Sequence, residues 1–205
     1  MPITSESILM HENPIIDFML KRRSVLAGSM IEPAPSDADL NTILSIATRV
    51  PDHAKLTPWH IQVLHKPGQQ ALADVYRDAF VKANPEANDV LVKSAHERLT
   101  RSPLVLVVSC QPRAEKFEKI PHIEQQLSAG AVCSHILIAA GALNYAAQWL
   151  TGGPAYEPAV KQALGMSEDC DIVGFIHLGS KADEPRERPR PELETVVSEW
   201  DGSAL

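Results

Sequence analysis

Apolar residues spaced three and four positions apart predict helices in the first half of the chain. The first helix begins at Pro14 and ends in a basic cluster. The second follows Ser36, an N-cap with Asp39 three residues later, and Pro51 stops it. Two further stretches are rich in Ala, Glu, Lys and Arg and have one apolar face. Helices are expected there over residues 69–84 and 85–101.

Three other segments have the composition of β-strands. Residues 59–66 alternate in character and lie between a proline and a Pro-Gly pair. Residues 104–110 read LVLVVSC, a continuous apolar run typical of a strand buried on both faces. A further strand is predicted over residues 172–179, which read IVGFIHLG. Because helical stretches separate these strands, we expect an α/β or α+β arrangement around a sheet.

The longest apolar stretch predicts one buried helix over about residues 123–149. It is nearly long enough to cross a bilayer, but polar residues such as Ser128 and His135 are costly in lipid. Its many small residues allow another backbone to approach closely. A short helix is expected after it, near residues 156–164.

Composition narrows the possible functions. The chain has 205 residues, of which 44% are hydrophobic and 22% charged, as in a single globular domain. The formal net charge of −7 makes nucleic acid an unsuitable partner, because a phosphate backbone repels this sign. The first 13 residues have no basic leader and no apolar core, so we expect neither export nor membrane insertion, and a cytoplasmic protein.

Familiar catalytic and metal-binding motifs are missing. The three cysteines, Cys110, Cys133 and Cys170, include no CxxC pair, which argues against a disulfide framework or a zinc ribbon and favours a reducing compartment. GxGxxG, P-loop, GxSxG and HExxH patterns are also absent. We therefore expect no metal site.

The tripeptide Arg22-Arg23-Ser24 after the first helix is a candidate phosphate site. Arginine donates paired, charge-assisted hydrogen bonds to phosphate, and the serine hydroxyl is a further donor. The same cations would also complement the negative end of the helix dipole. The tripeptide alone does not separate these two interpretations.

Two other segments have candidate binding chemistry. After the second helix, Arg49, His53 and Lys55 lie in a stretch stiffened by Pro51 and Pro58, which either preorganises a site or only ends a helix and starts a strand. The expected end of the central helix reads QWLTGGP. Its glycine pair either exposes backbone N–H groups to a planar ligand or caps the helix.

Taken in order, these motifs resemble the nitroreductase family of FMN-dependent, NAD(P)H-oxidising flavoproteins. They are RRS after the first helix, PDHxxLxPW after the second, then WLTG, VGFIHLG and a terminal RPRP, and they extend over roughly residues 14–200. The resemblance implies an α+β fold with a central, mostly antiparallel sheet flanked by helices. It also implies an intertwined homodimer with two FMN sites at the subunit interface.

The resemblance divides the chain and assigns roles to its residues. It implies a flexible tail over residues 1–13, an FMN-binding domain over 14–179 and an arm over 180–205 that packs on the partner subunit. The expected FMN-binding residues are Arg22, Arg23 and Ser24 at the phosphate and ribityl chain, Arg49 and His53 at the flavin, Trp149, Leu150 and Thr151 along the isoalloxazine, and Arg188 or Arg190 at the phosphate. His53 would reach the flavin of the other subunit. The nicotinamide path would be bordered by Ala139, Ala140, Gly141, Ala142, Leu143 and Asn144.

The implied activity is reduction of nitroaromatics, quinones or similar small electrophiles by ping-pong hydride transfer through flavin N5, with NADH or NADPH as donor. The flavin performs the chemistry, so no side chain is expected to be catalytic. The alternatives are a flavin enzyme for a specific aldehyde, enone or flavin, and a non-catalytic flavin-binding dimer. One departure is Ala54, because relatives often have glycine after Pro-Asp-His and alanine narrows the backbone conformations available.

Overall fold

The computed structural model describes residues 12–113, 115, 119–200 and 202. The chain divides into two compact units. The larger unit is Ser24–Glu184, and the smaller one combines the segment ending at Arg23 with the segment that begins at Pro185. Every strand lies in the larger unit, and α1 (Pro14–Lys21) lies in the smaller one.

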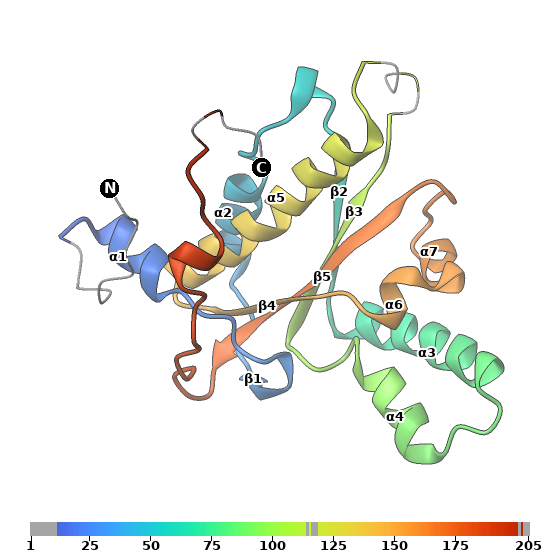
Figure 1. Cartoon of the computed structure of the whole chain (residues 1–205). Coiled ribbons are helices and arrows are strands. Elements are labelled where there is room, and N and C mark those ends of the chain that lie inside the picture. Colours follow the sequence, from blue (N-terminus) through green and yellow to red (C-terminus); the bar gives the residue numbers. More distant parts are fainter. Residues whose placement is uncertain (1–11, 114, 116–118, 201, 203–205) are drawn as a thin grey trace. The chain divides into compact units, whose positions relative to one another are not determined.

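A five-stranded antiparallel sheet forms the centre of the larger unit (Figure 1). Its longest strand, β5 (Asp171–Lys181), pairs with three of the other four strands, and β3 pairs with the last. The remaining strands are β1 (Met30–Ile31), β2 (Trp59–Leu64), β3 (Leu104–Cys110) and β4 (Ala146–Leu150). This arrangement confirms the predicted α+β fold with an antiparallel sheet.

Helices cover both faces of the sheet, and side chains of β3 pack against the helices on each face. All seven of its residues are buried. Leu106 packs with the core on one face, and Val105 and Val107 pack with the core on the other. Burying each large apolar side chain contributes about 1.5–3 kcal/mol. On the first face lie α2 (Asp37–Ala47) and α5 (His122–Ala142), and on the second α3 (Lys66–Ala83), α4 (Asp89–Glu97), α6 (Gly153–Tyr156) and α7 (Pro158–Ala163).

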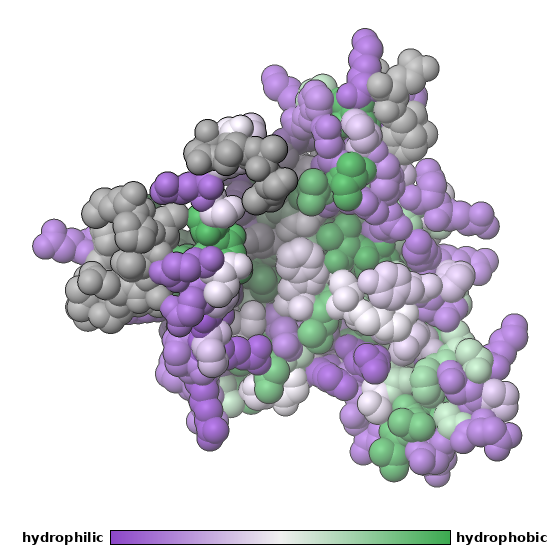
Figure 2. All heavy atoms as spheres, viewed as in Figure 1, coloured by the Kyte–Doolittle hydropathy of each residue, from purple (hydrophilic) through white to green (hydrophobic). Residues whose placement is uncertain are grey.

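The α3–α4 pair keeps hydrophobic surface of its own. Tyr76 of α3, Ala95 of α4 and Leu99, just after α4, belong to the same buried cluster. Val90 and Leu91, in the first turn of α4, remain exposed, Val90 at 74%. Figure 2 shows hydrophobic side chains in green over α4. The sheet-side face of this pair is therefore buried while the beginning of α4 meets solvent.

The cap of α2 has the predicted hydrogen bonds. The backbone N–H of Asp39 donates to Ser36 Oγ at 3.2 Å, and Ser36 Oγ donates to Asp39 Oδ2 at 2.8 Å. The same carboxylate oxygen accepts from the Tyr145 hydroxyl at 2.7 Å. The pKa of Asp39 lies below its usual value because Tyr145 and then Ser36 donate to the ionised form. The cap thus joins the start of α2 to the segment after α5.

The predicted end of the first strand is wrong. Pro67 and Gly68 were expected to lie in a turn after a strand over 59–66, but β2 ends at Leu64 and both residues lie in the first turn of α3. Proline suits that turn because its missing N–H has no partner inside the helix there. The Pro-Gly pair therefore begins a helix in this chain.

The predicted central helix is also too long. It was expected to reach residue 149, but α5 ends at Ala142 and β4 begins at Ala146. Asn144 has φ of 67°, and the N–H groups of Asn144 and Tyr145 donate to the carbonyls of Gly141 and Ala140. These two bonds form a Schellman cap with asparagine at its left-handed position. The last part of the apolar stretch is therefore the C-terminal cap of α5 followed by strand β4.

Smaller differences concern the ends and number of elements. The helix predicted over 85–101 is α4, which begins at Asp89, and the helix expected near 156–164 is two short helices, α6 and α7. The two-residue strand β1 was not predicted. All three cysteines are buried and free, and burial raises the pKa of the Cys133 thiol to about 12. Among the helices of the described residues, none has the length and apolarity that a bilayer crossing requires.

We expect the Ser36→Ala variant to lower the free energy of unfolding by about 1 kcal/mol, since it removes the side-chain acceptor of the α2 cap. Denaturant titration measures this loss. Ser45→Ala is a matched control in the same helix, because the Ser45 hydroxyl donates to the carbonyl of Asn41 four residues earlier and caps nothing. Equal stability of the two variants would contradict a role for the cap.

Candidate functional site

The side chain of Arg23 is held in a fixed position at the end of α1. Its Nη1 donates to the carbonyl oxygens of Arg22 at 2.8 Å and Leu20 at 3.2 Å. Only 9% of the side chain is exposed. Nε is buried and has no hydrogen-bond partner among the described residues. A buried, unsatisfied donor of this kind is costly, so an acceptor that reached Nε would stabilise the guanidinium.

Charges of both signs surround Arg23 in the smaller unit. The guanidinium forms an ion pair with the Glu187 carboxylate. Burial lowers the pKa of Arg23, and the nearby positive charges of Arg190 and Arg22 lower it further. Arg188 instead donates its backbone N–H to Glu187 at 3.0 Å. Of the two C-terminal arginines, Arg190 is therefore the one whose charge acts on Arg23.

The segment that begins at Ser24 lies along β4 in the larger unit. The N–H of Val25 donates to the carbonyl of Ala147 at 3.1 Å, and the N–H of Ala27 donates to Gln148 Oε1 at 2.6 Å. Ser24 itself is exposed. These contacts bring the Ser24 end of the first motif next to the strand that contains Trp149, although more than a hundred residues separate them.

Trp149 lies on the α5 side of the sheet. Its indole Nε1 donates to the carbonyl of Val173 at 3.0 Å, and the ring lies 3.8 Å from a Cβ position built on Gly130 of α5. The side chain is 36% exposed. The expectation that Trp149 ends a helix is wrong, because Trp149 and Leu150 end β4. Alternation along this strand turns Leu150 to the opposite face.

The turn after β4 keeps the open backbone that the sequence indicated. Thr151 is exposed, and Gly152 follows with φ of 79°, a conformation that L side chains rarely adopt. A Cβ on the next residue, Gly153, would collide with the Tyr76 ring. Both glycines are thus required by the geometry of the turn, which begins α6 instead of capping a longer helix.

The Pro-Asp-His loop has an unusual backbone. Ala54, Lys55 and Thr57 all have positive φ, at 55°, 56° and 51°. Left-handed conformations cost non-glycine residues free energy, so neighbouring contacts must hold the loop. One such contact is the hydrogen bond from the N–H of Thr57 to Asp52 Oδ2 at 2.8 Å. The loop is therefore shaped by strain and by its own polar contacts as well as by its two prolines.

Side chains of α5 anchor this loop. Ser128 Oγ donates to the carbonyl of Pro51 at 2.8 Å and accepts from Trp59 Nε1 at 3.2 Å. His53 Nδ1 lies 2.7 Å from Glu124 Oε2. Between the loop and α5 lies a groove of about 580 Å³. Its lining includes His53, Glu124 and Leu127.

The other predicted residues are more dispersed. Arg49 is exposed just after α2, and its N–H donates to the carbonyl of Ile46. Ala139 and Ala140 are buried in the core against the sheet, whereas Ala142 and Asn144 are exposed. Asn144 Oδ1 accepts from Lys181 Nζ at 3.2 Å. Only part of the predicted nicotinamide path thus reaches the surface.

Several residues of these sites were not found from the sequence: Glu124, Ser128, Gln148 and Glu187. Each forms a hydrogen bond or ion pair with a residue that is distant in the sequence. The spacing of residues along the chain therefore does not predict these contacts. No group of three or more His, Cys, Asp or Glu side chains in the described part of the chain is placed to hold a metal ion.

The model of the nitroreductase family matches residues 21–180, which include both the Ser24 segment and the β4 turn. The chain belongs to the nitroreductase family. Within this family it is similar to YdjA of Escherichia coli K12, named provisionally as an NAD(P)H nitroreductase. The two are 32% identical over 165 residues, which cover 80% of this chain and 87% of YdjA. A Haemophilus influenzae protein with the same provisional name is 28% identical over 150 residues, covering 72% of this chain and 79% of that protein.

Solved structures of nitroreductases share the fold. A nitroreductase-like protein from Bacillus cereus superposes with a TM-score of 0.78 at 22% identity, covering 95% of this chain and all of that one. A Bacteroides fragilis nitroreductase with bound FMN superposes with a TM-score of 0.63 at 19% identity, covering 94% and 98% of the two chains. At this identity the similarity establishes the fold. The role of each residue must be argued from the contacts of this chain.

We expect Ala54→Gly to raise the free energy of unfolding by about 1 kcal/mol, because glycine relieves the left-handed strain at φ of 55°. Thermal or denaturant unfolding measures the gain. Ala87→Gly, in the connection between α3 and α4, is a control at an alanine that is not among the residues with positive φ. A loss of stability in the Ala54 variant as large as in the control would show that strain does not govern this loop.

Proposed function

We propose that the protein is an FMN-dependent oxidoreductase that takes electrons from NADH or NADPH and reduces electrophilic small molecules, such as nitroaromatics or quinones. The observation that carries this proposal is the state of Arg23. Its buried guanidinium keeps one donor unsatisfied, has two further arginines close by and pairs with a carboxylate from the same unit. An arginine in this state is suited to an anion that outcompetes the carboxylate.

The phosphate of FMN meets this requirement. A phosphate monoester carries about −1.5 to −2 charges at neutral pH and has three acceptor oxygens. It would replace the single charge of Glu187 at Arg23, accept from the unsatisfied Nε, and interact with Arg22 and Arg190. Ser24 would contribute its exposed hydroxyl to the phosphate or the ribityl chain. Arg188 is the weaker candidate of the C-terminal pair.

The β4 turn would hold the isoalloxazine. The Ser24 segment is hydrogen-bonded along β4 within the larger unit, so a ribityl chain bound at Ser24 would lead toward Trp149, Leu150 and Thr151. The open backbone after Leu150 and the positive φ of Gly152 allow a planar ring to approach main-chain groups. This fit supports FMN, a long ligand with one anionic end and one planar end.

The loop on α5 would complete the site from a second subunit. His53 and Leu127 line an open groove, and Leu127 is 65% exposed although it is apolar. Burying this face in a homodimer would remove it from water, with His53 directed to the flavin of the partner. Of the arm predicted over 180–205, Ser180 and Lys181 belong to β5 and pair with β1, so only the part beyond Lys181 would pack on the partner. We also retain residues 14–179 as the FMN-binding domain and the cytoplasm as its compartment.

The protein's task in this mechanism is orientation and electrostatics. When bound, FMN would supply the hydride chemistry that links the nicotinamide to the acceptor, and Arg22, Arg23 and Ser24 would hold its phosphate and ribityl chain. Arg49 would favour the reduced ring by placing positive charge near N1. The segment from Ala139 to Asn144 would border the nicotinamide through its exposed end, since Ala139 and Ala140 lie in the core. No protein side chain is assigned a proton transfer.

The absorbance spectrum of the purified protein tests this proposal. We expect flavin bands that bleach when NADH or NADPH is added without oxygen and return when a nitroaromatic or quinone is supplied. Reduction by NAD(P)H with no turnover of either acceptor class would favour a metabolite-specific flavin enzyme. A colourless protein that cannot be loaded with FMN would overturn the cofactor assignment.

We expect Arg23→Ala to weaken FMN binding about ten- to a hundredfold, as charge-assisted hydrogen bonds contribute about 1.5–3 kcal/mol each. Flavin fluorescence during titration of the apoprotein measures this affinity. Lys21→Ala is the control, because Lys21 is the last residue of α1, two positions before Arg23, and pairs with Asp17. Unchanged FMN affinity in the Arg23 variant would place the phosphate elsewhere.

A further inference from the structure

The loop that contains His53 concentrates backbone strain in one place. Three of the four residues 54–57 have positive φ although none is glycine: Ala54, Lys55 and Thr57. Left-handed residues of this kind cost free energy, and they cluster where a ligand or an active site requires a particular backbone. The hydrogen bond from Ser128 Oγ to the carbonyl of Pro51 helps to hold the loop against α5. The direction of the His53 side chain is therefore fixed by contacts that stabilise a strained backbone.

The carboxylate that meets His53 belongs to Glu124, in the first turn of α5. Glu124 Oε2 lies 2.7 Å from His53 Nδ1, and the two side chains are 44% and 57% exposed. An ionised carboxylate can only accept a hydrogen bond, so Nδ1 holds a proton whether the ring is neutral or charged. The other ring nitrogen, Nε2, has no hydrogen-bond partner among the described residues, and His53 lines the groove on α5. In the neutral ring, Nε2 is therefore an unused acceptor at an open surface.

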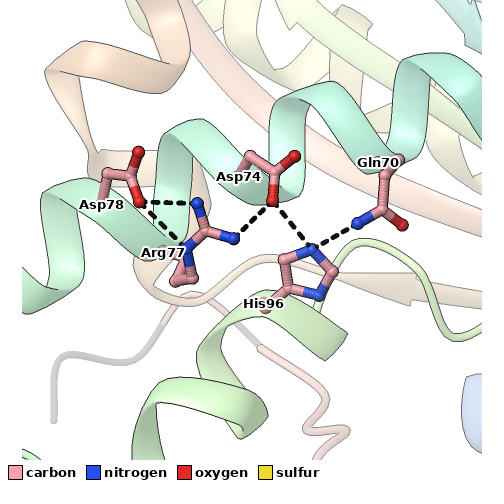
Figure 3. Close-up of polar contacts among 5 residues, drawn as sticks. All are labelled: Gln70, Asp74, Arg77, Asp78 and His96. Atoms are coloured by element: carbon pink, nitrogen blue, oxygen red, sulfur yellow. Dashed lines mark hydrogen bonds and ion pairs between the residues drawn. The ribbon is translucent and has the colours of Figure 1, made fainter.

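Two other histidine–carboxylate pairs among the described residues have different surroundings. The first joins α4 to α3 (Figure 3). His96 Nε2 lies 3.3 Å from Asp74 Oδ1 and 2.8 Å from Gln70 Nε2. Asp74 also accepts from Arg77 Nη1 at 2.6 Å. This carboxylate thus belongs to a network that connects two packed helices, and stability alone explains it.

The second pair joins α5 to β5. His122 Nε2 lies 2.8 Å from Asp171 Oδ2, which also accepts from Gln126 Nε2 at 2.8 Å. Lys161 Nζ lies 3.7 Å from the other oxygen of Asp171. Here too several groups share one carboxylate. Glu124 differs, because His53 is the one hydrogen-bond partner of its carboxylate among the described side chains.

The other charged groups near this pair are bound to the backbone or lie in solvent. Asp52 is the second carboxylate in the lining of the groove, and it accepts from the N–H of Thr57 at 2.8 Å. Arg113 Nη2 donates to the carbonyl of Thr57 at 3.4 Å. Lys55 is exposed. Glu124 is therefore the charged residue that acts directly on the imidazole ring.

We propose that Glu124 is a positioning residue for His53, which it holds with Nε2 directed into the groove as a hydrogen-bond acceptor for the flavin of the partner subunit. The ring of FMN has an N–H and its ribityl chain has hydroxyls, so either part offers a donor. Without Glu124 the neutral imidazole would exchange between two tautomers, of which only one has an acceptor at Nε2. The inference rests on the proposed function, because it requires a flavin within reach of His53.

Nitrogen-15 NMR of the purified, flavin-loaded protein tests the tautomer of His53. At a pH where the ring is neutral, we expect the proton on Nδ1 and none on Nε2. Glu124→Gln should replace this signal by the average of two tautomers, because an amide donates as well as accepts. Glu97→Gln is the control, an equal change of charge at an exposed glutamate of α4 that pairs with Lys93. A wild-type ring protonated at Nε2, or a tautomer unchanged in Glu124→Gln, would overturn the proposal.

The affinity for FMN tests whether Glu124 and His53 act as a unit. We expect Glu124→Gln and His53→Phe each to weaken FMN binding about tenfold, as for the loss of one hydrogen bond, and the double variant to bind no more weakly than either. Asp74→Asn, which breaks the histidine pair of the α3–α4 network, should leave the affinity unchanged. Because Glu124 and His53 are about half exposed, neither substitution should unfold the protein, and circular dichroism checks this.

The outcomes separate this proposal from the proposed function. Weaker FMN binding in His53→Phe but not in Glu124→Gln would overturn the role of Glu124 and leave the flavin assignment intact. Equal affinity in the wild type and both variants would also overturn this proposal alone. A protein that cannot be loaded with FMN would overturn the cofactor assignment and the role of Glu124 together.

Discussion

The pairing of β5 with three other strands is the constraint on which the rest of the larger unit depends. β5 brings β3 and β4 into one sheet, and β4 in turn hydrogen-bonds the segment that begins at Ser24. A shift of one residue in this register would reverse every side chain, sending Trp149 and Leu150 to the wrong faces. The position of the β4 turn, and of the Ser24 segment beside it, is therefore a consequence of one hydrogen-bonding pattern.

Much of this architecture can be predicted from the sequence, because in many segments the capping residues and the hydrophobic pattern favour the same element that the folded chain adopts. The cap at Ser36 and the continuous apolar run of β3 are local signals, and tertiary packing preserves both. The order of the motifs led to the correct family and fold because it does not depend on the boundaries of any element. The residues predicted for FMN, by contrast, remain proposals.

The predictions were wrong or incomplete where an uncommon residue takes a structural position or where the contact is distant in the sequence. Asparagine at residue 144 takes the left-handed position that glycine usually fills, so the end of α5 had no glycine to mark it. The strand that follows, β4, has small and polar residues and only two large apolar ones, and it is recognisable only from its partner β5. The contact between Arg23 and Glu187 was equally inaccessible, because it joins residues more than 160 positions apart.

The contact of Glu187 with Arg23 also bears on how tightly any anion can be held there. A carboxylate tethered to the same chain is present at high effective concentration whether or not a ligand is added. The affinity of an incoming phosphate is the intrinsic affinity of the arginine cluster multiplied by the fraction of molecules in which Glu187 has moved away. The acidic residue between two arginines of the tail would thus act as a resident competitor. It neutralises a buried cation in the structure, and it would lower the affinity of any anion that bound there.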